Sequence, residues 1–425
     1  MLKKLLLSFA IKPQFLFFII IGFNITVTAQ EEYTINRFLS SINESKLVYI
    51  DSATTAQLND KNYSIPIIKS AQFRLETRRF VETFQEYSLR VKPNSIRAMS
   101  NQNDLYRSKI EVVRLSNQIK INEELKNRYL ILIEFVFTKK IIDSYLIRQQ
   151  QLKDKLELLK HKVYDENFDI KDLIESEEDL MATNLKLIQL QKINKDQLSY
   201  LKETLELEEN AIDINFENLI HPEQVMNFNV PDSIPHEYLF VSLQKLKLNI
   251  IENEMKLSVA KSKQFLDFVQ AKYIGKSENI FEDNLSLGLG INLPFFGTAR
   301  QEKSEFYFET LTQEYELNED LEKHNLKIKF AKNEFDTAVL NYETFNTQNK
   351  ESSISLVYDT YKKMEGVSPL LLLKLKIIQN KKDIEILRFE QELYISFIEY
   401  LSLNEILFQK PYLNYLSNTL EILNN

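Results

Sequence analysis

The chain has 425 residues, of which 44% are hydrophobic and 27% are charged, and its formal net charge is −8. An acidic chain lacks the basic surface that neutralises phosphates, so no nucleic-acid partner is expected. The absence of cysteine excludes disulfides, thiolate metal sites, a cysteine nucleophile and a lipid anchor on cysteine.

The N-terminus has the layout of a secretory signal peptide. Lys3 and Lys4 precede the apolar stretch 15–23, and small residues then lead into an acidic start within 27–32. We predict cleavage after Ala29. A membrane anchor is the alternative, but about ten apolar residues are too few to cross a bilayer as a helix. The protein is therefore expected to be exported.

Proline and glycine are rare, so their positions mark the expected elements. Neither occurs in residues 94–221 or in residues 298–365. Both stretches are rich in leucine, lysine, glutamate, glutamine and asparagine, which predicts long helices. If continuous up to its reversal, each run would form a helix of about 105–110 Å at 1.5 Å per residue.

Two stretches have the two-residue period of strands. Before Pro93, apolar residues alternate with polar ones at the end of segment 70–92, which predicts a β-hairpin there. Before Pro294, apolar residues alternate with small or polar ones over 285–293, and 264–273 is the expected partner strand. We therefore predict two β-hairpins, each preceding a long helical stretch.

Two short breaks are expected to reverse the long helices. In the first, Asn167 can take a left-handed conformation and Asp169 can cap the next helix. In the second, Gly366 and Ser368 can play these two roles, with Pro369 at the first helical position.

The segment after Pro369 shows a coiled-coil period, with apolar residues spaced alternately by three and four. Its ten seam positions are Leu370, Leu373, Ile377, Asn380, Ile384, Leu387, Gln391, Tyr394, Ile398 and Leu401.

These landmarks recur at about 200 residues, which predicts a duplicated unit of β-hairpin and long helical hairpin in a mainly α protein. We therefore expect five divisions: a signal peptide (1–29), a first repeat (30–215), a linker (216–235), a second repeat (236–410) and a C-terminal tail (411–425). The first repeat is expected to contain an N-terminal helix, a β-hairpin at about 70–92 and a helical hairpin at about 94–215 with its tip near 167. The second is expected to contain a helix, a β-hairpin at 264–293 and a helical hairpin at 295–410 with its tip near 366.

Four strands are too few to close a barrel, and an open sheet edge cannot lie in lipid. Three chains would supply twelve strands. In such a barrel the apolar set would face lipid and the other set the lumen. The lipid-facing residues would be Leu285, Leu287, Leu289, Ile291 and Leu293, and the lumen-facing ones Ser286, Gly288, Gly290 and Asn292. A water-soluble hairpin with one face packed on a helix has the same alternation, so it remains the alternative.

The order of these motifs resembles the TolC-type outer-membrane efflux family. "LSLGLGINLPFFGTARQEKSE" is similar to that family's second strand-to-helix junction. "VYDENFDIKDLIESEEDL" and "YKKMEGVSPLLLLKLKII" are similar to its two helical tips. The resemblance covers most of residues 60–410. It implies a homotrimer with a 12-stranded outer-membrane β-barrel and a periplasmic α-helical barrel.

The resemblance also implies passive export, in which the tips meet a periplasmic adaptor of an inner-membrane transporter. The corresponding tip residues are Asn167, Phe168, Asp169, Gly366, Val367 and Ser368. Where the family often has an acid after the second tip, this chain has Leu371. A carboxylate ring at a tunnel entrance would have to use Asp172 and Glu175, although these acids are explained more simply as complements to a helix dipole.

No catalytic or cofactor-binding pattern occurs in the sequence. It has no glycine-rich phosphate loop and no nucleophile motif, and its histidines lack metal-site spacing. We therefore expect no enzymatic activity, no cofactor and no metal. The histidines that lack this spacing are His161, His221, His236 and His324.

The alternative to an export duct is a soluble periplasmic coiled-coil scaffold or binding protein.

Overall fold

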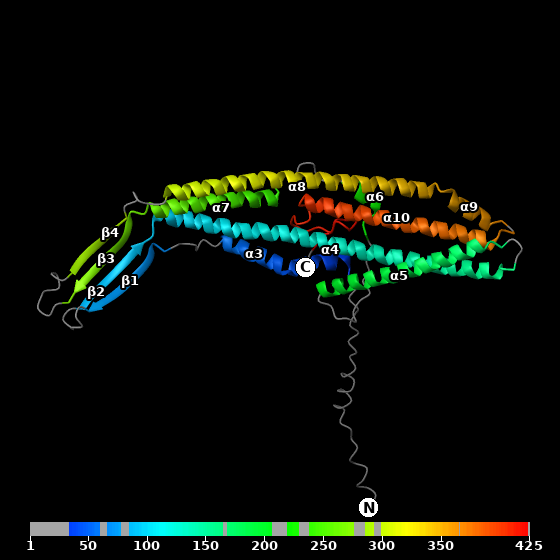
Figure 1. Cartoon of the computed structure of the whole chain (residues 1–425), viewed down its shortest axis with the longest axis horizontal. Helices are drawn as coiled ribbons and strands as arrows, with labels where there is room; N and C mark the ends of the chain where they lie inside the picture. The colour runs from blue at the N-terminus through cyan, green and yellow to red at the C-terminus, as the bar shows by residue number, and fades with distance from the viewer. Residues whose placement is uncertain are drawn as a thin grey trace, which may run out of the picture.

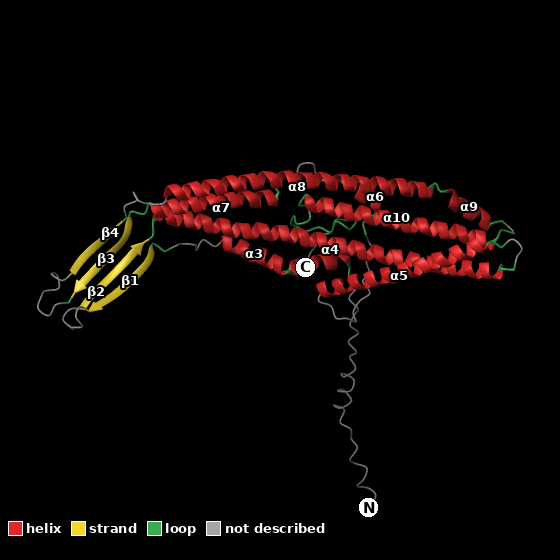
Figure 2. Cartoon of the chain, in the orientation of Figure 1, coloured by secondary structure: helices red, strands yellow, loops and turns green. Residues whose placement is uncertain are grey.

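The structure is a computed structural model. It describes residues 34–59, 66–77, 85–164, 168–205, 219–228, 238–275, 285–292, 299–364 and 366–423. The predicted signal peptide lies outside these residues. The described chain is elongated, with a small sheet at one end, long helices running away from it, and both helical reversals at the opposite end (Figures 1 and 2).

The sheet is antiparallel and has the strand order β1-β2-β3-β4. Its strands are β1 (Ile68–Thr77), β2 (Gln85–Pro93), β3 (Leu266–Ile274) and β4 (Leu285–Ile291). The two hairpins join through β2 and β3, where Val91 lies opposite Val269 and Tyr87 opposite Tyr273. β1 and β4 therefore form the two edges, and β4 pairs only with β3 among the described strands.

The first helical stretch forms one unbroken helix, α4 (Ile96–His161), of 66 residues. At 1.5 Å per residue it is about 100 Å long. The Ser95 side chain caps its start by accepting from the Ala98 N–H, and Lys160 and His161 lie in its last turn, where positive charge is favoured. After the first reversal, α5 (Ile170–Thr204) runs back along α4.

The second helical stretch is interrupted, which corrects the continuous helix expected over 298–365. α8 (Ala299–Lys350) ends before Ser352, whose hydroxyl accepts from the Ile354 N–H and caps a separate helix, α9 (Ser353–Lys362). Serine competes for backbone hydrogen bonds in this way and so favours helix starts over helix interiors. α10 (Pro369–Leu403) then returns along α8.

Shorter helices complete the fold: α2 (Ile35–Ser40), the 3₁₀ helix η1 (Ser41–Glu44), α3 (Lys46–Asn59), α6 (Pro222–Met226) and α7 (Leu239–Ser262). The single helix expected before the first hairpin is thus three short ones. Among the described helices, none combines the length and the apolar character needed to cross a membrane.

The seam predicted on α10 faces the other helices most closely in its second half. Asn380, Ile384, Tyr394 and Leu401 are buried, while the seam positions nearer the tip are half-buried. α10 packs on α4 on one side and on α8 on the other, so the seam belongs to a layer of helices rather than to one two-stranded coil. The Asn380 amide donates to the Ser144 carbonyl of α4 at 3.0 Å.

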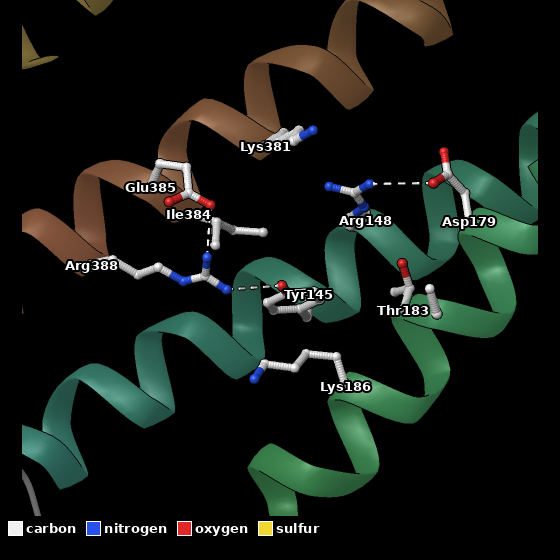
Figure 3. A pocket seen from close by; sticks show the side chains of 10 residues that line it. Tyr145, Arg148, Asp179, Thr183, Lys186, Lys381, Ile384, Glu385 and Arg388 are labelled. Carbon is white, nitrogen blue, oxygen red and sulfur yellow. Dashed lines mark hydrogen bonds and ion pairs between the residues drawn. The ribbon is translucent and has the colours of Figure 1, made fainter.

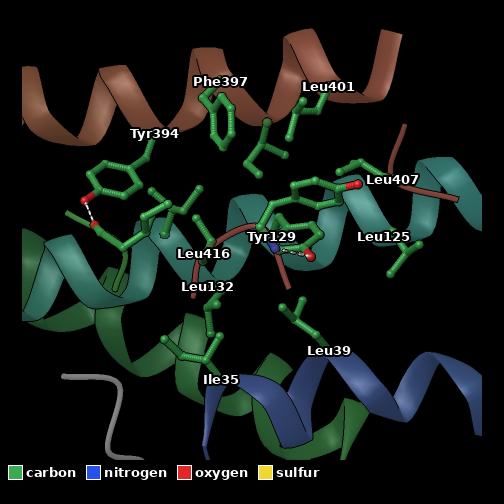
Figure 4. Packing of buried hydrophobic residues seen from close by; sticks show 14 of the residues in the cluster. Ile35, Leu39, Leu125, Tyr129, Leu132, Tyr394, Phe397, Leu401, Leu407 and Leu416 are labelled. Carbon is green, nitrogen blue, oxygen red and sulfur yellow. Dashed lines mark hydrogen bonds between the residues drawn. The ribbon is translucent and has the colours of Figure 1, made fainter. Parts of the chain in front are cut away.

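The core includes residues of the segment 404–423 (Figure 4), which lies midway along the molecule (Figure 1). Leu416 is fully buried, and its carbonyl accepts from the Ile220 N–H at 2.7 Å. The Tyr129 hydroxyl of α4 donates to the Leu413 carbonyl at 2.7 Å and accepts from the Tyr415 N–H at 3.2 Å. The segment expected only as a C-terminal tail therefore fastens α4 to the linker between the repeats.

Candidate functional site

The first reversal has the cap that the sequence predicts. The Asp169 carboxylate accepts from the Lys171 N–H at 2.9 Å and starts α5. Phe168 is half-buried beside it, and Asn167 lies outside the described residues.

The second reversal depends on a left-handed glycine, as predicted. Gly366 has φ +84°, and a β-carbon there would meet nothing within 4 Å, so glycine is required by the backbone conformation rather than by crowding. Val367 is half-buried and Ser368 exposed. Ser368 occupies the N-cap position and Pro369 the first helical position, but the Ser368 side chain makes no capping hydrogen bond.

An ion pair that the sequence analysis missed links the two tips. Lys374 Nζ of α10 lies 2.9 and 2.8 Å from the two carboxylate oxygens of Asp172, in the first turn of α5. The hydrogen bond from Lys374 lowers the pKa of Asp172. The two residues are 202 positions apart, which is about the length of one repeat. Opposite charges at equivalent positions of the two repeats could therefore have indicated this ion pair from the sequence. Glu175 is exposed.

We predict a pH-dependent effect of Asp172→Asn on stability. A partly exposed pair of this kind contributes about 0.2–1 kcal/mol. Because the pKa of Asp172 is lowered on folding, this contribution is present above the unfolded pKa of about 3.9 and is lost as the pH falls through the folded value. The difference in unfolding free energy between wild type and variant should be measurable at pH 7 and should decrease as the pH falls below the unfolded pKa. Glu175→Gln, which changes an exposed acid one turn away, should show no such difference.

The sheet at the other end has one apolar face, and no described helix covers it. The exposed fractions of Leu287 and Leu289 on β4 are 79% and 67%, and that of Phe73 on β1 is 70%. Leu89 of β2 lies on the same face, because it pairs directly with Phe73. A water-soluble hairpin with its apolar face packed on a helix was the alternative, and these residues do not have that arrangement. Also on this face are Leu285 and Ile291; Leu293 lies outside the described residues.

The opposite face is polar and its side chains cover one another. Ser286 lies opposite Lys272, which forms an ion pair with Glu86, a residue with 7% exposure. Gly288 lies opposite Gln270. The sheet thus separates an open apolar surface from a polar surface on which Lys272 and Glu86 form an ion pair. The remaining predicted residues of this polar set are Gly290, opposite Phe268, and Asn292, whose N–H donates to the Phe265 carbonyl.

Gly290 is crowded by a side chain, whereas Gly366 has a left-handed backbone conformation. A β-carbon on Gly290 would lie 2.3 Å from the Phe268 ring, whereas one on Gly288 would meet its nearest neighbour, the Gln270 β-carbon, at 3.9 Å. The Phe268 ring therefore covers Gly290 on the polar face.

We predict that Gly290→Val destabilises the sheet by about 1–3 kcal/mol through overpacking. Gly288→Val, two residues away on the same face, should be tolerated because the site has room and strands favour valine. In a Phe268→Ala background the cost of Gly290→Val should largely disappear. Thermal unfolding of wild type, Gly290→Val, Phe268→Ala and the double variant measures this coupling. Equal costs for Gly290→Val in both backgrounds would contradict it.

The outer helices carry apolar stripes that no other described helix covers extensively. On α5 and on α8 the stripe residues fall on one face at 3.6 residues per turn. α5 and α8 do not pack extensively on each other. They therefore form the two edges of the helical layer, just as β1 and β4 form the two edges of the sheet. The exposed stripe residues are Ile170, Ile174, Met181, Leu185 and Ile188 on α5, and Phe308, Leu311, Tyr315, Leu326, Phe330 and Leu340 on α8.

A cavity of about 300 Å³ lies where α4, α5 and α10 meet (Figure 3). Arg388 of α10 donates to the Tyr145 hydroxyl of α4 at 3.3 Å and to Glu385 at 2.8 Å. Arg148 of α4 lies 4.0 Å from Asp179 of α5. These contacts link three helices to one another. In the described part of the chain, no group of three or more histidine or acidic side chains could hold a metal ion.

No protein-family model matches the sequence, and no curated protein matches it significantly. Solved structures share its architecture. The Campylobacter jejuni CmeC outer membrane channel is 11% identical, with a TM-score of 0.61 over 87% of this chain and 85% of that one. The open state of the Neisseria gonorrhoeae MtrE outer membrane channel is 10% identical, with a TM-score of 0.62 over 87% of this chain and 88% of that one. The outer membrane protein VceC of Vibrio cholerae is 8% identical, with a TM-score of 0.56 over 85% and 95%.

Proposed function

Because the chain has the fold of TolC-type outer-membrane efflux channels, as its sequence motifs predict, we propose that it is one subunit of a passive export duct. The duct would carry small molecules or proteins across the periplasm and outer membrane in a tripartite efflux or type I secretion system. The observation that carries this proposal is a four-stranded sheet with an uncovered apolar face and two unpaired edges.

Such a sheet needs both a non-aqueous surrounding and further strands. Lipid would cover the apolar face that includes Leu287 and Leu289, and the polar face with Ser286 and Gly288 would line a lumen. The edges β1 and β4 would pair between copies, since an open edge in lipid leaves its backbone groups without hydrogen bonds. Three copies would give a closed, even-numbered barrel of twelve strands.

The helical layer supports the same assembly. If β4 of one copy pairs with β1 of the next, α8 of the first copy comes next to α5 of the second. The tip-proximal part of the α8 stripe, which includes Leu340, would then be buried against the α5 stripe and would close a periplasmic tunnel there. A homotrimer of this kind has cyclic symmetry, in which each copy uses two different surfaces and the ring closes.

The helical reversals would lie at the periplasmic end of the tunnel. There we propose that Phe168, Asp169, Val367 and Ser368 meet a periplasmic adaptor, together with Asn167 and Gly366. Energy for export would come from the inner-membrane transporter, so this chain needs no catalytic residues. We retain the proposed division into a signal peptide and two repeats, which implies export to the outer membrane.

Cell fractionation followed by electrophoresis tests this function. The full-length protein should occur in the outer-membrane fraction as a trimer that dissociates on heating. Recovery as a periplasmic monomer would instead support the soluble scaffold and would contradict the proposal.

A further inference from the structure

The polar face of the sheet carries more positive than negative charge, and the excess is at one residue. Three ion pairs lie on or beside this face: Lys272 with Glu86, Lys92 with Asp267 at 3.6 Å, and Arg74 with Glu76 at 2.5 Å. The remaining charged side chain in the paired register of this face is Arg90.

Neutral groups hold Arg90 in place. Its Nε and Nη2 donate to the Gln270 side-chain oxygen at 3.2 and 3.0 Å, and its guanidinium lies 4.0 Å from the centroid of the Phe268 ring. In the described part of the chain it has no carboxylate partner. The Phe268 ring in turn rests over Gly290. A cation on an aromatic face with two N–H groups donating to one amide oxygen keeps both its full charge and a fixed position.

On the basis of the proposed function, we propose that Arg90 determines an anion-favouring potential in the lumen of the barrel. Three symmetry-related chains would place three such guanidinium groups at one level of the lumen wall. Rings of arginine or lysine favour anions in pores, and charges on a lumen wall tune selectivity. The class of solute favoured at this level is therefore anionic.

The ratio of chloride to potassium permeability in planar bilayers tests this inference. Reversal potentials would be measured under a KCl gradient with purified wild-type trimer and with Arg90→Lys, Arg90→Gln and Arg90→Glu. Arg90→Gln should lower the permeability ratio by about twofold at 0.1 M salt, and Arg90→Glu should lower it by about the square of that factor because it changes twice the charge. Arg90→Lys should keep the wild-type ratio.

Two controls separate charge from structure. The double variant Glu86→Gln/Lys272→Gln removes a pair without changing net charge and should leave the ratio unchanged. The shifts should also shrink at 1 M salt, where screening is stronger. If Arg90→Gln fails to form trimers, Arg90→Met, which keeps a long stem over Phe268, takes its place.

The possible failures are distinguishable. Wild-type protein that forms neither trimers nor conducting channels contradicts the proposed function itself. Channels whose permeability ratio is the same in wild type, Arg90→Gln and Arg90→Glu contradict only the role of Arg90. Loss of the ratio in Arg90→Lys would show that side-chain shape rather than charge matters and would also overturn the inference.

Discussion

Replacing Leu289 with arginine should remove most of the trimer from the outer membrane. Leu289 lies in the middle of β4 on the apolar face, opposite Val269, and is 67% exposed in the chain. An arginine near the middle of a lipid-facing strand costs about 2–4 kcal/mol, and a homotrimer would bear this cost in each of its three copies. Quantitative blotting of heat-modifiable trimer in membrane fractions measures the loss.

The exposure of Leu289 makes this test specific. Within a single chain in water an arginine at this position would be solvated, so a soluble protein should tolerate it. Ser286→Glu is the matched control, because it places a charge on the opposite face of the same strand, across from Lys272. Opposite charges on paired strands are favourable, so this variant should assemble normally. Normal assembly of Leu289→Arg as well would contradict a lipid-facing apolar surface.

Replacing Leu416 with alanine should be strongly destabilising, by about 2–5 kcal/mol. Leu416 is fully buried in the central core, and its backbone carbonyl also accepts the hydrogen bond from Ile220. Removing three carbons from a packed site loses burial and leaves a cavity that its surroundings fill only partly. A lower midpoint of thermal unfolding in detergent, followed by circular dichroism, measures the effect.

Leu420→Ala is the matched control in the same segment. Leu420 is 36% exposed, so the same change of side chain should alter stability by less than about 1 kcal/mol. Equal midpoints for Leu416→Ala and wild type would show that the C-terminal segment does not stabilise the core. A loss of trimer in Leu416→Ala without a change in midpoint would likewise contradict a structural role.

The two variants test two different kinds of contact, those between copies and those within one chain. The Leu289→Arg prediction concerns a surface that a single chain leaves open, and the Leu416→Ala prediction concerns contacts that a single chain completes. The sheet and the helical layer both end in free edges, whereas the central core closes around Tyr129 and Tyr394. Leu289→Arg should therefore prevent assembly while the subunit still folds. Leu416→Ala should impair both folding and assembly.

The sequence was informative where structure depends on local periodicity and on backbone conformation. The alternation over 285–293 predicted a strand, which forms over Leu285–Ile291, and the absence of proline and glycine after Pro93 predicted the long helix α4. Gly366 and Asp169 were predicted at the reversals because left-handed φ and helix capping depend on the residue itself.

The predictions were wrong or silent where a contact joins distant segments. The interruption of α8 and α9 at Ser352 was missed, because serine is tolerated within helices and its capping role depends on context. Lys374 was not recognised as the partner of Asp172, and 411–425 was expected only as a tail, although Tyr129 of α4 bonds to it. Each of these contacts spans more than 200 residues, or requires a choice between conformations that the local sequence allows.

The sequence by itself determined the periods, the reversals and the apolar and polar faces of each element, because these follow from residue type and spacing. Only the tertiary structure decided that the two hairpins join through β2 and β3, that the apolar face of the sheet stays uncovered, and that Phe268 lies over Gly290 beneath Arg90. The physical reason is that register, packing and charge pairing are properties of segments brought together by the whole fold, and the free energy of each contact depends on partners that the local sequence does not contain.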